Sequence, residues 1–263
     1  MEPAPKRSVS LFPSGDLYPV YVADPHRTGN AAMVHFYSRT EIAGSSGTRT
    51  SLKAGGRFGV VRWGAASPGG RSWQISLDAG LDAIFDSKYK LDNIGWDGNY
   101  GVTVTTASAA RLSLKFGVLH CSAHVGDEYM ERTGRTRIDD SREELAVGAR
   151  YRIAAQWSAY GELGVAYKQL TEEQAPWRWQ GGVEWESTRK LLGGHFVWYA
   201  SMDIALWQER DWRPDLALQG GVAAKDSGRT WRFGVEYTNG RAPLGEFFQD
   251  TEARLTLGFW VDL

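Results

Sequence analysis

Apolar and polar residues alternate with a period of two along most of this chain. From about residue 31 onward, alternating segments of roughly 10 to 14 residues are separated by clusters of Gly, Pro, Ser and Asp. In residues 73–85 one face is apolar, and the facing set from Gln74 to Asp82 is polar or glycine. The same separation recurs in residues 195–206 and 253–263. Because successive strand side chains point to opposite faces, the pattern predicts strands with one apolar and one polar face.

The connections between these predicted strands alternate in length. A soluble β-sandwich also has alternating strands, but long external loops that alternate with short periplasmic turns are typical of an up-and-down outer-membrane barrel. The sequence therefore predicts an all-β fold, a transmembrane antiparallel up-and-down β-barrel of about 12 strands over residues 31–263. The predicted long connections are residues 86–98, 125–140 and 239–251, and the short ones are residues 65–71, 107–110, 154–156 and 225–228.

Tryptophan positions supply an independent test. The ring prefers the boundary between headgroups and hydrocarbon, so a barrel should carry two aromatic bands. The periplasmic band is predicted to contain Trp63, Trp73, Trp157, Trp185, Trp198 and Trp231. The outer band is predicted to contain Trp96, Trp177, Trp179, Trp207 and Trp212.

Composition excludes several classes of protein. Mean hydropathy is −0.39, and no apolar run approaches the roughly 20 residues that a spanning helix needs. The net charge of −1 and the lack of a basic tract argue against nucleic-acid binding. The one cysteine, Cys121, excludes an internal disulfide. We expect a bacterial outer-membrane location, with an export signal already removed ahead of Met1.

Residues 1–30 break the alternation and contain several prolines. They are predicted to form either a periplasmic cap or a plug in the barrel mouth, ahead of the barrel at residues 31–263.

Three stretches resemble an uncharacterised bacterial family, a domain of unknown function. They are residues 12–18 (FPSGDLY), 120–129 (HCSAHVGDEY) and 208–212 (QERDW). The terminal stretch Thr256–Leu263 also resembles the C-terminal insertion signal of outer-membrane proteins, although it ends in Leu rather than Phe. The resemblance implies an outer-membrane protein and brings no activity.

The stretch from Arg111 to His124 carries the candidate chemistry. Its apolar parity, from Leu112 to Val118, continues into His120, Ser122 and His124. Polar groups that face lipid are costly unless they lie near the interface or have a function. A serine two residues from a histidine on one face is a candidate nucleophile with its general base.

An orienting acid is predicted on the next strand. A regular hairpin around residues 125–140 would place Glu143 opposite Ser122, with Cβ atoms roughly 5 Å apart and His120 on the diagonal. This His-x-Ser pattern is similar to outer-membrane phospholipase A and to the barrel-type lipid A 3-O-deacylases. The resemblance implies His120 as base, Ser122 as nucleophile and Glu143 as orienting acid. Ala123 departs from both families, which have Asn after the serine.

The alternative for these residues is a solvated patch among headgroups. One ion cannot bind both His120 and His124 without a bend, since roughly 13 Å separates them along a strand. In the following loop Asp127 and Glu128, with Asp139 and Asp140, are candidates for calcium, and a solvated acidic loop is the alternative. The Gly126 amide or a calcium ion is a candidate for oxyanion stabilisation.

The leading hypothesis is a lipid acyl-ester hydrolase that acts on phospholipid or lipopolysaccharide, as a monomer or homodimer. The alternative is a non-catalytic barrel, either a narrow solute channel or a structural and surface-interaction protein. Mixed charges on the predicted inner face either pair and fill the lumen or line a pore. They are Arg57, Asp78, Asp82, Arg111, Lys115, Glu144, Arg150, Arg152, Glu162, Lys168, Asp203, Arg232, Glu236 and Arg254.

Overall fold

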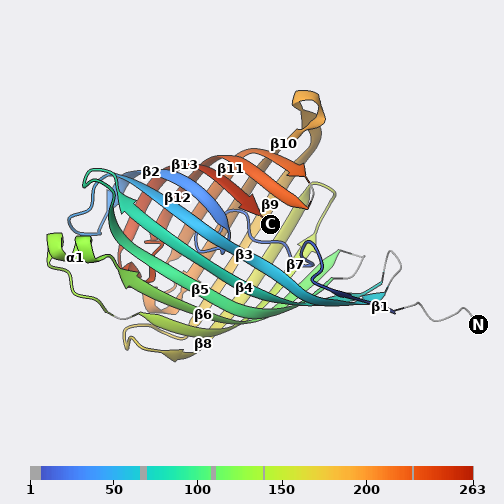
Figure 1. The fold of residues 1–263 in the computed structure, drawn as a ribbon, viewed down its shortest axis with the longest axis horizontal. Helices are drawn as coiled ribbons and strands as arrows, with labels where there is room; N and C mark the ends of the chain where they lie inside the picture. Colours follow the sequence, from blue (N-terminus) through green and yellow to red (C-terminus); the bar gives the residue numbers. More distant parts are fainter. Residues whose placement is uncertain (1–6, 66–69, 108–110, 139, 227, 263) are drawn as a thin grey trace, which may run out of the picture.

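The chain folds into a closed antiparallel β-barrel, as the alternation predicts (Figure 1). The computed structural model describes residues 7–65, 70–107, 111–138, 140–226 and 228–262. Each wall strand pairs with the next one in the chain, and pairing of the first with the last closes the barrel. The wall strands are β2 (Asn30–Thr40), β3 (Thr48–Ala65), β4 (Ser72–Asp86), β5 (Asp92–Ala107), β6 (Leu112–Val125), β7 (Ser141–Arg152), β8 (Trp157–Gln169), β9 (Trp177–Leu191), β10 (Phe196–Trp207), β11 (Pro214–Asp226), β12 (Arg229–Arg241) and β13 (Thr251–Asp262).

The two ends of the barrel differ in their connections. One, the long-loop end, carries the connection 126–140 with helix α1 (Asp127–Thr133), and the connection 242–250 with the short helix η3 (Gly245–Phe247). It also carries the short helix η2 (Gln208–Arg210), whereas η1 (Leu192–Gly194) lies at the opposite, short-turn end. Among the described residues, no helix has the length and apolar character needed to cross a membrane. Short turns face the periplasm in outer-membrane barrels, so the long-loop end is assigned to the cell exterior.

One predicted loop was wrong. Residues 86–98 were expected to be a long connection, but β5 begins at Asp92 and pairs with β4 from there onward. The Asp, Asn and Gly residues that suggested a loop are accommodated beside a register shift between Ile84 and Phe85. Asp97 and Gly98 therefore belong to the barrel wall.

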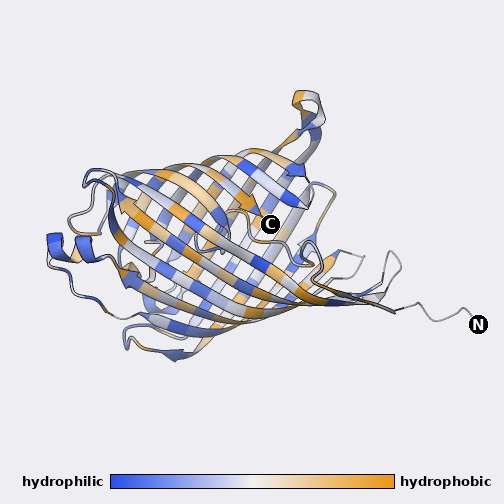
Figure 2. Ribbon diagram, in the orientation of Figure 1, coloured by the Kyte–Doolittle hydropathy of each residue, from blue (hydrophilic) through white to orange (hydrophobic). Residues whose placement is uncertain are grey.

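Apolar and polar residues alternate along the wall strands (Figure 2), and many of the large apolar side chains are exposed. On β6, Leu112, Leu114, Phe116 and Val118 are exposed, while Lys115 between them is buried. At the short-turn end Trp63 opposes Trp73 and Trp157 opposes Trp185, which agrees with the predicted periplasmic band. Trp207 is at the predicted end but is buried on the inner side.

The N-terminal segment from Tyr18 to Thr28 lies inside the barrel. The Tyr21 hydroxyl donates to Glu162 Oε2 at 2.8 Å, and the Val22 amide donates to Glu184 Oε1 at 2.9 Å. Arg27 forms an ion pair of 2.8 Å with Asp262. Before this segment, β1 (Arg7–Leu11) pairs with the last five residues of β3, beyond the point where β2 ends its pairing with β3.

Candidate functional site

The polar patch on the outside of β6 lies where the parity predicts. His120, Ser122 and His124 continue the outward row that begins with the exposed apolar residues of β6. All three are partly buried, and they lie toward the long-loop end, since β6 runs from the short turn at Leu112 to Val125. On the outer face of β6, apolar residues up to Val118 are thus followed by a serine between two histidines.

Two hydrogen bonds organise this patch. His120 Nδ1 lies 2.7 Å from Glu143 Oε1, and the two side chains are 14% and 26% exposed. Ser122 Oγ lies 2.9 Å from His124 Nε2. Within the described residues, the Nε2 atom of His120 has no hydrogen-bond partner. His120 is therefore bound at Nδ1 and open at Nε2.

The predicted register between β6 and β7 was wrong by two residues. Glu143 opposes His120, whereas Ser122 opposes Ser141. The Ala123 amide donates to the Asp140 carbonyl beside the long loop. Ser141 therefore pairs with Ser122, whereas the predicted hairpin would have paired it with His124. A shift of two leaves every side chain on its face, so alternation cannot detect it. The correction brings the acid to His120 directly.

Two aromatic rings from β5 cover the histidines. Trp96 is stacked on His124 with ring centroids 4.1 Å apart, and Tyr100 is stacked on His120 at 4.2 Å. Each ring is directly opposite its histidine in the β5–β6 register. Sequence reasoning missed this pair of contacts because it assigned Trp96 to a loop. The alternation of Trp96, Gly98 and Tyr100 was the available signal.

A β-bulge brings a cation to the same outer patch. Lys168 was expected in the lumen, but the register between β7 and β8 shifts between Glu143 and Glu144. Lys168 is consequently exposed and opposes Glu143 across the strand pair. A bulge adds one residue to one strand and so reverses the facing of the residues beyond it.

The residues expected to bind calcium or an oxyanion make other interactions in the structure. Asp127 and Glu128 form the acidic first turn of α1, where they complement the helix dipole. Among the described residues, no cluster of three or more His, Cys, Asp or Glu side chains could hold a metal ion. Asp139 lies outside the described residues. The Gly126 amide donates to the Ile94 carbonyl at 2.9 Å and is not free to bind an oxyanion.

Most of the predicted inner charges form a paired network in the lumen. Glu162 accepts hydrogen bonds from Arg178 at 2.5 Å and from Tyr21, and it pairs with Lys115. Arg178 also donates to Glu144. Arg111 and Arg152 are exceptions because they are exposed at the short-turn end. With the N-terminal segment, this network fills the middle of the barrel.

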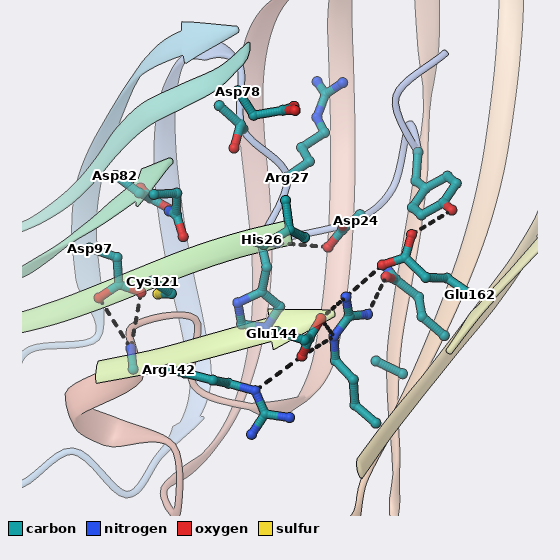
Figure 3. Close-up of a pocket in the computed structure, with 18 of the residues that line it drawn as sticks. Asp24, His26, Arg27, Asp78, Asp82, Asp97, Cys121, Arg142, Glu144 and Glu162 are labelled. Carbon is teal, nitrogen blue, oxygen red and sulfur yellow. Dashed lines mark hydrogen bonds and ion pairs between the residues drawn. The ribbon is translucent and has the colours of Figure 1, made fainter. Parts of the chain in front are cut away.

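A cavity lies on each side of this paired network. The first, of about 220 Å³, is lined toward the long-loop end by Asp97, Asp140 and Gln174 (Figure 3). The second, of about 670 Å³, is lined at the short-turn end by Arg111, Arg152 and other residues. Pro19, Val20 and Thr28 of the N-terminal segment line both cavities, so this segment lies between them.

The closed barrel, apolar exterior and charged interior define an outer-membrane β-barrel protein. Residues 6–260 match the family model described as "Protein of unknown function (DUF1207)", and the chain belongs to this family. A search of curated protein sequences finds no match.

Solved barrels resemble the fold at low sequence identity. Outer membrane phospholipase A from Escherichia coli is 8% identical with a TM-score of 0.56, over 89% of this chain and 91% of that one. The Salmonella typhi outer membrane phospholipase dimer with bound calcium is 11% identical, also with a TM-score of 0.56, over 89% of each chain. The KdgM porin is 9% identical with a TM-score of 0.42, over 90% of this chain and 99% of that one.

Proposed function

We propose that this barrel hydrolyses acyl esters of membrane lipids at the outward patch on β6. The observation that carries the proposal is the 2.7 Å contact between His120 Nδ1 and Glu143 Oε1, two residues from a serine on the same lipid-facing row. A carboxylate bound to Nδ1 fixes the imidazole tautomer and stabilises the imidazolium that forms during acyl transfer.

Ser122 is the nucleophile. Residues two apart on a strand are about 6.8 Å apart at Cα, a gap that serine and histidine side chains can span. In the resting arrangement His124 holds the Ser122 hydroxyl at 2.9 Å. Rotation about the Ser122 Cα–Cβ bond turns Oγ toward the open Nε2 of His120, which makes His120 the base and His124 a positioning residue.

The reaction then proceeds in the two steps of a serine esterase, acylation and deacylation of the serine. His120 takes the proton of Ser122 as Oγ bonds to the acyl carbonyl carbon, and the intermediate expels the lipid alkoxide, which receives that proton. Water attacks the acyl-serine, His120 takes a water proton, and the released serine oxygen recovers it as the fatty acid leaves. The substrate reaches this site from the lipid phase, because the patch continues the apolar outer row of β6.

Analysis of lipid products by mass spectrometry tests the proposal. Folded wild-type protein is incubated with phospholipid and with lipid A, with and without calcium, beside Ser122→Ala and the matched control Ser141→Ala. Ser141 lies opposite Ser122 on the same outer face. Acyl release by wild type and Ser141→Ala, with loss in Ser122→Ala, supports the proposal. Equal release by both variants, or none by wild type, contradicts it.

A second candidate function, a gated solute channel, is favoured by the two charged cavities that lie in line along the lumen. The N-terminal segment between them would have to move for solute to pass. Conductance in planar bilayers without any lipid turnover would favour this function over hydrolysis.

A further inference from the structure

Three carboxylates stand in a row along the wall of the upper cavity, the one toward the long-loop end. Asp82 on β4 lies directly opposite Asp97 on β5, and Asp97 lies opposite Ala123, whose amide donates to the Asp140 carbonyl. The side chains of Asp82, Asp97 and Asp140 are all buried and line this cavity. Like charges directly opposed on neighbouring strands are destabilising unless something offsets them.

Among the described residues, only one of the three carboxylates forms an ion pair. Lys53 Nζ lies 2.6 Å from Asp82 Oδ2, which leaves Asp82 Oδ1 without a hydrogen-bond partner. Asp97 accepts only the Gly245 amide, at 3.0 and 3.2 Å, and Asp140 Oδ1 accepts from Gln174 Nε2 at 2.5 Å. Burial of a carboxylate without an ion pair costs free energy, and burial raises the pKa of Asp140 although Arg241 and Arg142 oppose the shift.

Gly245 lies close to both Asp97 and Asp140. Its amide binds Asp97, and a Cβ atom at this position would lie 2.3 Å from Asp140 Oδ2. Figure 3 shows Asp82, Asp97 and Cys121 on the same side of the cavity.

Gln174 adds an independent acceptor. Its side chain is 8% exposed and lines the cavity, and its Oε1 atom has no partner. The acceptors Asp82 Oδ1 and Gln174 Oε1, with the carboxylates of Asp97 and Asp140, call for a ligand group rich in N–H donors. A primary ammonium group has three donors and a positive charge.

Unpartnered donors also face this cavity. The Trp207 Nε1 and Arg241 Nε atoms are buried without partners, and the Arg241 guanidinium lies 4.1 Å from the Trp207 ring centroid. Arg142 and Arg178 both bind Glu144. Arg241 pairs with Glu209 at 3.4 Å through a terminal nitrogen, which leaves the Nε atom of Arg241 without an acceptor. The ligand therefore needs an acceptor group as well as an ammonium.

We propose that the upper cavity binds a small primary ammonium compound that also carries a carboxylate or hydroxyl. The ammonium binds among Asp82, Asp97, Asp140 and Gln174, and the acceptor end binds Trp207 and Arg241. The cavity of about 220 Å³ has room for a small ligand, because its volume equals that of several water molecules at about 30 Å³ each in the liquid. Asp140, Gln174 and Gly245 come from the long-loop end, so the proposed site lies toward the cell exterior.

Titration calorimetry with purified full-length protein tests this site, using 4-aminobutyrate, butylamine and butyrate as matched probes. We expect saturable binding of 4-aminobutyrate, weaker binding of butylamine and the weakest binding of butyrate. Asp97→Asn and Asp140→Asn should each weaken 4-aminobutyrate binding by about tenfold or more. The control Glu172→Gln, an exposed acid at the same end, should bind as wild type.

A thermal-unfolding series separates ligand binding from a structural role. Asp97→Asn relieves the repulsion with Asp82, so without probe it should melt no lower than wild type, and 4-aminobutyrate should raise the melting temperature of wild type alone. Asp140→Asn supplies the same measurement if Asp97→Asn does not fold. The proposal is overturned if wild type binds no amine, if butyrate binds as tightly as 4-aminobutyrate, or if calcium chloride binds while both amines do not.

Discussion

The two faces of β6 carry polar clusters of opposite character. Inside, Lys115 pairs with Glu162, which Arg178 and Tyr21 also bind, so each charge has several partners. Outside, Ser122 has a single hydrogen bond and the Nε2 atom of His120 has none among the described residues. A saturated network stabilises a fold, whereas an open nitrogen beside a hydroxyl is suited to proton transfer. The inner face of β6 thus carries a paired network, and its outer face carries the proposed site.

The largest expected effect is on the outer face. His120→Asn removes the proposed base and should lower acyl release by about 10²- to 10⁴-fold. His124→Asn should lower it far less, because His124 only positions the hydroxyl. Release rates from mixed-lipid vesicles measure both variants, with His195→Asn, exposed at the short-turn end, as the control. The reverse ranking would make His124 the base.

Substitutions in the inner network should lower the stability of the barrel and leave the rate of hydrolysis unchanged. Glu162→Gln leaves Lys115 and Arg178 short of a buried carboxylate and should cost about 3–5 kcal/mol in the free energy of unfolding. Urea unfolding in detergent, followed by tryptophan fluorescence, measures this loss. The exposed pair of Glu186 and Lys225 gives the control, where Glu186→Gln should cost less than about 1 kcal/mol. A comparable loss in both variants would remove the contrast between the two faces.

Glu143→Gln sharpens the outer-face assignment. The change keeps the side-chain shape but removes the charge that stabilises the His120 imidazolium, so acyl release should fall by about 10- to 100-fold. Folding should be unaffected, as measured by the gel mobility of heated and unheated protein. Hydrolysis at the wild-type rate would mean that Glu143 does not orient the base.

The smallest expected effect is at the bulge. Lys168→Gln removes an exposed cation opposite Glu143 and should weaken the use of anionic lipids by about fivefold in KM, from about 1 kcal/mol of attraction near the surface. The rate at saturating lipid should stay constant. Kinetics on vesicles with and without anionic lipid measure this difference, and an equal change on neutral vesicles would argue against a headgroup contact.

Alternation predicts the strands and the outward row, because those depend only on period two, and the connection lengths with the tryptophan positions add the barrel and the membrane location. It also predicts the partners His120, Ser122, His124 and Glu143 on one face. The exact pairing of His120 with Glu143 was out of reach, since a two-residue register shift preserves parity. Lys168 was misplaced because a bulge has no signature in the alternation, and Trp96 because Asp, Asn and Gly within a strand imitate a loop.

The route of the N-terminal segment has a mechanical consequence. The segment starts after β1 at the short-turn end, reaches His26 beside Trp207 near the opposite end, and returns to Asn30, which pairs with Val261 at the short-turn end again. A loop tethered twice at one rim is not threaded through the barrel. Withdrawal of this loop toward the periplasm would break its contacts with Glu162, Glu184 and Asp262 but none of the pairings between wall strands.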